Sequence, residues 1–172
     1  EQFIVIGATQ LGESLDHHPE LRAAMPSVLG LRDLTALIPA DARQRSSLDV
    51  AAAQELARVF WPTRAYARAR AVLARHRFVV LTGPPEMGKT AIARMVALAQ
   101  MTDGWEAYEC TSPDEVRRAF DSGRRQVFVA DDAFGSTEYR PDAAELWARE
   151  LGRLLQALDD RHWLIWTSRP AP

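Results

Sequence analysis

The second half of the chain alternates short apolar runs with segments of helical spacing. Apolar runs cover 77–82, 105–110, 126–132 and 162–168. Apolar residues recur every three or four positions over 90–101, 112–120 and 141–160. The last two apolar runs are nearly continuous, as in strands that are covered on both faces. Repeated strand-then-helix units predict an α/β fold with a parallel sheet and right-handed crossovers.

The first half has a short apolar strand over 3–6 and is otherwise mostly helical in pattern. Helical spacing is present over 18–25, 31–38, 48–60 and 63–76. Ser47 is the predicted N-cap of the third of these helices, and Pro62 and Thr63 separate it from the fourth. The change of pattern predicts an N-terminal segment over 1–45, a helical lead-in over 46–76 and an α/β core over 77–172.

Within the core, one helix start has an especially clear signal. Ser112 is followed by Pro113 and, three residues on, by Glu115. This spacing predicts a helix with Ser112 as N-cap, proline in the first turn and a capping box. Gly123 is the predicted end of the same helix.

Composition and charge narrow the class of protein. The chain has 172 residues, 47% of them hydrophobic, which is enough for a core. A net charge of −2 does not favour a general nucleic-acid binder, and no apolar run approaches the roughly 18 residues of a membrane span. The single cysteine and the four histidines show no metal-ligand spacing. We therefore expect a cytoplasmic protein without membrane attachment.

The loop after the strand 77–82 contains the only lysine of the chain; the other basic residues are arginines. Gly83 to Thr90 fits the pattern G-x-x-x-x-G-K-[ST] and lies between a predicted strand and a predicted helix, which is the context of a phosphate-binding loop. Lys89 offers a compact charge that can reach the β- and γ-phosphates, and the Thr90 hydroxyl can bind Mg²⁺. The residues expected to hold the nucleotide are Gly83, Pro84, Pro85, Glu86, Met87, Gly88, Lys89, Thr90 and Ala91.

Two other features bear on this interpretation of the loop. Glu86 stands where glycine is frequent, which the pattern permits but which places a carboxylate near the phosphates. The alternative is a strand-to-helix turn without a ligand.

Two acids follow the third apolar run, and an arginine follows the fourth. Asp131 is the predicted Mg²⁺ carboxylate, and Asp132 is the predicted group that orients or deprotonates the attacking water. Arg169 follows the fourth run and can reach the γ-phosphate at the carboxyl edge of the sheet. The alternatives are that Asp131 and Asp132 merely begin a loop and that Arg169 belongs to a polar strand exit. Lys89, Asp132 and Arg169 are the predicted catalytic residues.

Together these segments resemble a family. The stretches 79–94, 127–135 and 163–170 look like the Walker A, Walker B and sensor-1 segments of STAND ATPases, the AAA+-related signalling branch of the P-loop NTPases. The aromatic and proline residues ahead of the loop are similar to the novel STAND families of bacterial conflict and antiviral defence systems. The resemblance covers 60–172. It implies a three-layer fold with sheet order 5-1-4-3-2, use of ATP and Mg²⁺, and adenine placed near Phe60, Pro62 and Tyr66.

The resemblance also sets expectations about what lies beyond the chain. The sequence begins at Glu1 and ends after the fourth predicted core strand, so we expect the N-terminal part of an NTPase module whose fifth strand and helical lid lie elsewhere. Residues 1–45 would be the tail of an effector domain with a linker. Nucleic acid would then be contacted only through that separate effector domain.

Three functions are consistent with these residues. The first is an ATP-binding and ATP-hydrolysing switch, whose exchange between ATP and ADP controls self-association and an effector in response to an unknown trigger. The second is a P-loop kinase of a small molecule or nucleotide, in which Asp132 would deprotonate a substrate hydroxyl. The third is a non-hydrolysing adaptor that binds nucleotide, which has no need of the second acid.

Overall fold

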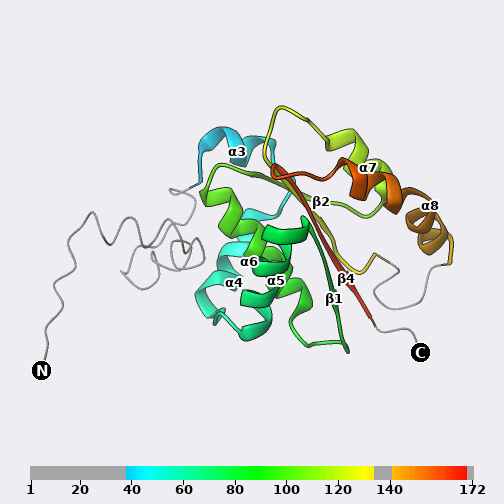
Figure 1. The fold of residues 1–172 in the computed structure, drawn as a ribbon. Coiled ribbons are helices and arrows are strands. Elements are labelled where there is room, and N and C mark those ends of the chain that lie inside the picture. Colours follow the sequence, from blue (N-terminus) through cyan, green and yellow to red (C-terminus); the bar gives the residue numbers. More distant parts are fainter. Residues whose placement is uncertain (1–37, 134–140, 170–172) are drawn as a thin grey trace, which may run out of the picture.

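The computed structural model describes residues 38–133 and 141–169 (Figure 1). The elements are α3 (Ala40–Arg45), α4 (Val50–Val59), α5 (Arg64–His76), β1 (Phe78–Thr82), α6 (Lys89–Thr102), β2 (Glu106–Glu109), α7 (Pro113–Ala119), β3 (Gln126–Ala130), α8 (Pro141–Ala157) and β4 (His162–Ser168). The strand and helical patterns predicted ahead of residue 38 lie outside the described residues. The four core strands predicted from the sequence are present, each within two residues of its predicted bounds.

The four strands form one parallel sheet in the order β1-β4-β3-β2. β4 is therefore central: it pairs with β1 on one side and with β3 on the other. This arrangement confirms the predicted α/β fold with a parallel sheet. The five-strand order 5-1-4-3-2 includes a fifth strand that is not among those of the described residues, so this order stays a prediction.

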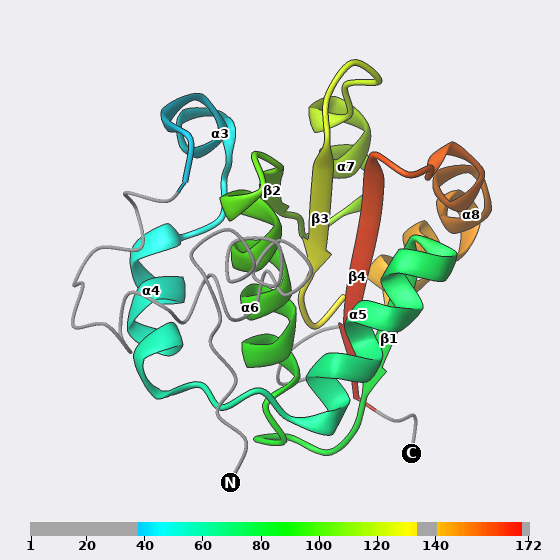
Figure 2. The same cartoon turned by 60° about the vertical axis from the view of Figure 1, so that its left-hand side comes forward.

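Helices cover both faces of the sheet, which makes three layers (Figure 2). The two faces are set by alternate residues along each strand. Val127 and Val129 of β3 pack with α4, α5 and α6, whereas Phe128 and Ala130 pack with α7 and α8. β3 is buried along its whole length, as its continuous apolar run predicts.

The helix boundaries follow local capping chemistry, and two of the predicted boundary residues are wrong. Ser112 caps α7 as predicted, but α7 ends at Ala119 and not at Gly123. The predicted cap Ser47 is wrong, because α4 begins two residues later and Asp49 accepts the hydrogen bond from the Ala52 amide.

The side chain of Glu115 forms a variant of the predicted capping box. Its carboxylate accepts hydrogen bonds from the backbone amide and the hydroxyl of Thr111, one residue before the cap. The start of α7 is thus held from both sides of Ser112.

Ser47 is used instead at the outer edge of β2. The amides of Ser47 and Leu48 both donate to the Ala107 carbonyl, while the Ser46 hydroxyl accepts from the Ala107 amide at 2.9 Å. The Ser47 hydroxyl accepts from the Glu109 amide at 3.0 Å. These residues pair with the backbone groups that an edge strand would otherwise leave open.

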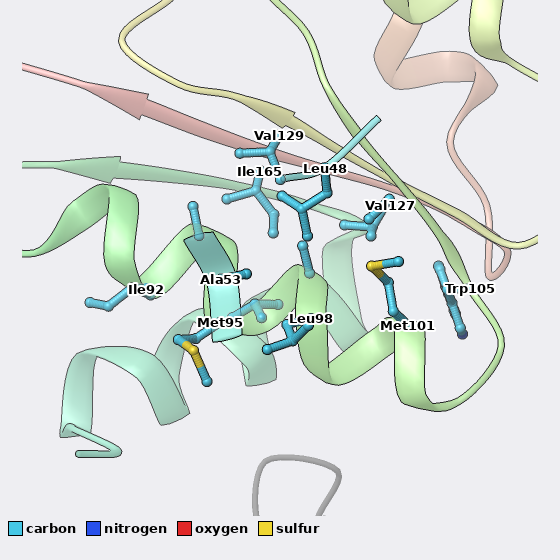
Figure 3. Close-up of a cluster of buried hydrophobic side chains, with 14 of the residues drawn as sticks. Leu48, Ala53, Ile92, Met95, Leu98, Met101, Trp105, Val127, Val129 and Ile165 are labelled. Atoms are coloured by element: carbon cyan, nitrogen blue, oxygen red, sulfur yellow. The ribbon is translucent and has the colours of Figure 1, made fainter. Parts of the chain in front are cut away.

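The segment ahead of α4 belongs to the same core as the sheet. Ile38, Ala42 and Leu48 are buried in the cluster that contains Val127 and Val129. Figure 3 shows Leu48 beside these strand residues, above α6. The described residues on either side of position 45 therefore pack together, although the three-part division of the chain stays a prediction.

Candidate functional site

The predicted site residues come from three strand ends at one edge of the sheet. Because the strands are parallel, the loops after β1 and β3 and the end of β4 share the carboxyl edge (Figure 2). β4 lies between the other two strands, so its last residues lie between the loop 83–88 and the acids Asp131 and Asp132. Ligands of open α/β sheets bind at this edge.

The loop 83–88 has the backbone of a tight strand-to-helix turn. Gly88 is the N-cap of α6 with φ of 77°, and Glu86 has φ of 64°. Positive φ is favourable for glycine and unfavourable for most other residues, which accounts for the frequent glycine at the position of Glu86. Glu86 is exposed. In the described part of the chain no side chain caps α6, so its first amides are available to an anion.

Lys89 is folded over its own loop. Its Nζ donates to the Gly83 carbonyl at 2.9 Å and to the Pro84 carbonyl at 2.8 Å. Within the described residues Lys89 forms no ion pair with an acid. The only lysine of the chain thus lies half-buried in the loop, where it is satisfied by carbonyl groups that a stronger acceptor could replace.

The hydroxyl of Thr90 joins this loop to the end of β3. It donates to Oδ1 of Asp131 at 3.0 Å, and the Thr167 hydroxyl of β4 donates to the same oxygen at 2.6 Å. In the described residues Asp131 has no arginine, lysine or histidine partner. A carboxylate and a hydroxyl at this distance are the hard oxygen donors that Mg²⁺ prefers, so the residues fit the expected metal.

The second acid and the arginine are less constrained by side-chain contacts. Asp132 is half-buried and has φ of 44°, and its amide donates to the Thr167 hydroxyl at 2.7 Å. Arg169 is exposed at the carboxyl end of β4. The fold brings Asp132 to the edge that carries Thr90 and Asp131. Arg169 follows β4, the strand between β1 and β3.

Residues 60–171 match the family model for novel STAND NTPase 3. The chain belongs to this family. No curated protein and no solved structure matches it. The match confirms the recognised class, a STAND-type NTPase, and membership of an NTPase family implies a nucleotide as ligand. Residues 38–59 lie outside the match, although they complete the core and the β2 edge of this NTPase.

The described residues contain neither a cluster of metal-ligating side chains nor a membrane-spanning helix. No group of three or more His, Cys, Asp or Glu side chains there could hold a metal ion, so a Zn²⁺-type site is absent from this part of the chain. Mg²⁺ needs only one or two carboxylates when phosphates supply other oxygens. No helix in the same part of the chain is both long and apolar enough to cross a membrane.

Cys110 lies near the edge but is not suited to thiol chemistry. Burial raises the pKa of its thiol to about 12, and the nearby Glu115 and Glu109 carboxylates raise it further. A reactive cysteine requires the opposite shift, because the thiolate is the nucleophile.

From the sequence, Thr167 is one of the polar residues that end the fourth apolar run, without a role of its own. The sequence pattern predicted Arg169 as the functional residue at the end of β4, whereas Thr167 makes the hydrogen bonds to both acids. The role of Thr167 follows from the register in which the parallel strands β3 and β4 pair. Trp166 of β4 pairs with Ala130, the last residue of β3. Thr167 and Asp131, which follow these two residues, therefore lie beside one another.

Of the residues expected to lie near adenine, Tyr66 is buried in the core and is not open to a ligand. Tyr66 is 1% exposed and packs edge-on against Phe60, with ring centroids 5.3 Å apart. Burial raises the pKa of its hydroxyl. Tyr66 therefore serves the core of this STAND NTPase and presents no open ring face, whereas the neighbouring Trp61 is 82% exposed.

Proposed function

We propose that this STAND NTPase binds ATP with Mg²⁺ at the carboxyl edge of its sheet and hydrolyses it. The observation that carries the proposal is the hydrogen bond between Thr90 and Asp131, because it joins the loop that would hold phosphate to the acid that would hold the metal. The uncapped start of α6 and the half-buried Lys89 support the same ligand.

Each side chain then has a distinct role. The backbone of 83–91 surrounds the phosphates, and Lys89 exchanges its two carbonyl acceptors for phosphate oxygens. Thr90 and Asp131 supply ligands for Mg²⁺. When bound, that ion would offset the negative charge of the β- and γ-phosphates. Asp132 orients the attacking water, and Arg169 contacts the γ-phosphate.

The nucleotide state is proposed to act as a switch in a longer protein. In this account ATP favours self-association, hydrolysis to ADP reverses it, and an effector responds to the assembled state. A role in bacterial defence, which the resemblance of 60–172 to novel STAND families suggests, and a cytoplasmic location are part of the proposal. The trigger would be recognised by another part of the protein.

A substitution at Lys89 tests nucleotide binding. In the full-length protein, Lys89→Ala should weaken ATP binding by roughly tenfold to a hundredfold, because a charge-assisted hydrogen bond is lost. Arg153→Ala is the matched control, since Arg153 is an exposed cation on α8 that pairs with Glu150. Calorimetric titration with ATP and Mg²⁺ measures both. Equal ATP affinity in wild type and Lys89→Ala would refute the proposal.

A substitution at Asp132 separates hydrolysis from binding. Asp132→Asn should lower the rate of phosphate release by about a hundredfold or more, with ATP affinity within about threefold of wild type. Asp114→Asn is the control, since Asp114 is an exposed acid on α7 that pairs with Arg117. An unchanged hydrolysis rate in Asp132→Asn would remove Asp132 from the mechanism. Transfer of phosphate to an added acceptor instead of water would favour the kinase alternative.

A further inference from the structure

One buried hydroxyl on the central strand contacts both acids of the candidate site. Thr167 is 0% exposed and lies one residue before the end of β4. Its Oγ1 donates to Asp131 Oδ1 at 2.6 Å and accepts from the Asp132 amide at 2.7 Å. Its carbonyl accepts from the Ala133 amide at 3.3 Å. Three consecutive residues after β3 are thus tied to one residue of β4.

The direction of these hydrogen bonds is determined by the groups themselves. A backbone amide can only donate, so the Thr167 oxygen must accept from Asp132 and direct its own proton to the carboxylate. A hydrogen bond to a charged acceptor is short and strong, in agreement with the 2.6 Å distance to Asp131. The hydroxyl therefore holds the carboxylate oxygen and the following peptide in one relative orientation.

The backbone at Asp132 needs such support. Its φ of 44° lies in the left-handed region, which a residue other than glycine adopts at a conformational cost. The hydrogen bond from its amide to Thr167 holds the chain in that conformation. The same contact therefore also determines where the Asp132 side chain leaves the backbone.

We propose that Thr167 is the positioning residue for both acids. It would fix Asp131 as a metal ligand and Asp132 as the water-orienting group without touching nucleotide itself. This inference rests on the proposed function. It adds to the site a residue of β4, the strand that lies between β1 and β3. Thr90 bonds the same Asp131 oxygen, but its own hydroxyl is the proposed metal ligand; Thr167 has no second role and can retain its contact.

The test compares variants that differ only in the hydroxyl. Thr167→Val removes the hydroxyl and keeps the branched shape, and Thr167→Ser keeps the hydroxyl. Thr102→Val makes the same change at a buried threonine of α6, where the hydroxyl donates to the Ala99 carbonyl away from the site. The measured quantity is the affinity of Mn²⁺, used as a probe for Mg²⁺, for the ADP complex of the full-length protein, read by electron paramagnetic resonance.

Thr167→Val should weaken Mn²⁺ binding by roughly tenfold to a hundredfold, as is usual when a residue that orients a metal ligand is lost. Thr167→Ser should stay within about threefold of wild type, and Thr102→Val should not differ from it. If Thr167→Val binds Mn²⁺ as tightly as wild type, the inference is wrong.

Two further outcomes are distinguishable. A wild-type protein that binds neither ADP nor Mn²⁺–ADP would contradict the proposed function itself. If Thr167→Val does not fold, Thr167→Ala is compared with Thr167→Ser, because both lack the methyl group and only serine has the hydroxyl. Equal Mn²⁺ affinity in that pair would overturn the role of the hydroxyl.

Discussion

The two ends of the sheet hold their acidic side chains in opposite ways. At the amino end Glu106, whose side chain is 5% exposed, is surrounded by donors of the chain itself: Arg124 at 3.0 Å, Tyr108 at 2.9 Å and Gln126 at 3.3 Å. At the carboxyl end Asp131 receives hydroxyl groups but has no cationic partner among the described residues.

This difference indicates which end is structural and which is meant for a ligand. A buried charge whose partners are built into the fold contributes to the folded state and leaves little to offer a ligand. At the carboxyl end, a carboxylate without a cationic partner and the free amides of an uncapped helix remain available to a ligand. Substitutions at the amino end should therefore lower stability, and those at the carboxyl end should lower nucleotide binding.

The largest effect is expected at Glu106. Glu106→Gln places an amide group among neighbours that are all donors, so the free energy of unfolding should fall by about 3 kcal/mol. ATP affinity of the fully folded protein should not change. Glu55→Gln is the control, because Glu55 is an exposed acid of α4 that pairs with Arg58. Denaturant unfolding gives both values, and equal stability of the two variants would break the comparison.

A slightly smaller loss is expected at Leu48, outside the family match. Leu48 is 4% exposed and packs in the core on one face of the sheet, so Leu48→Ala should lower the free energy of unfolding by about 2.5 kcal/mol. Leu155→Ala, at a side chain with 36% exposure on α8, should have little effect. Thermal unfolding distinguishes the two. If Leu48→Ala is neutral, residues 38–48 are not part of the folded unit.

His162 is expected to have an intermediate effect. Its Nδ1 lies 2.7 Å from Asp159 Oδ1 and its Nε2 lies 3.0 Å from the Asp121 carbonyl, while the ring stacks on Phe120. His162→Phe keeps the stacking and loses both hydrogen bonds, so stability should fall by about 1.5 kcal/mol. His76→Phe at the end of α5 should change stability by less than about 0.5 kcal/mol. A larger loss at His76 than at His162 would contradict this part of the account.

The smallest effect is a pH dependence at the amino end. The hydrogen bond from the Gly123 amide lowers the pKa of Asp121, and contacts with Arg124 lower it further. A carboxylate with a lowered folded-state pKa contributes stability above its unfolded pKa of about 4, and this contribution is lost as pH falls through the folded value. The melting temperature of Asp121→Asn should therefore fall less than that of wild type below about pH 4. Parallel curves would exclude Asp121 as a source of acid sensitivity.

The strands were predictable because each is a local apolar run, and β4 was predicted with its observed bounds over 162–168. The starts of α5 and α7 were predictable because Thr63 and Ser112 cap amides three residues away. Asp49 was overlooked as a cap because Ser47 is also a good capping residue, and only the pairing with β2 determines which of them is used.

Other features depend on contacts between residues distant in sequence. The end of α7 is one of them, because Phe120 leaves the helix and stacks on His162, far along the chain. The site shows the same limit: the motif residues were predicted from sequence, but Thr167 becomes visible only when β3 and β4 are placed side by side.

A matched pair of charge-removing substitutions tests the central claim most directly. Asp131→Asn and Glu106→Gln each replace a carboxylate by an amide, one at each end of the sheet. Mg²⁺-dependent ATP affinity and the free energy of unfolding are measured for both. We predict that Asp131→Asn loses Mg²⁺-dependent ATP binding but lowers the free energy of unfolding by only about 1 kcal/mol, because the amide oxygen can still accept from Thr167, with the reverse for Glu106→Gln. An Asp131→Asn protein that is destabilised as much as Glu106→Gln and still binds ATP with Mg²⁺ would contradict the account.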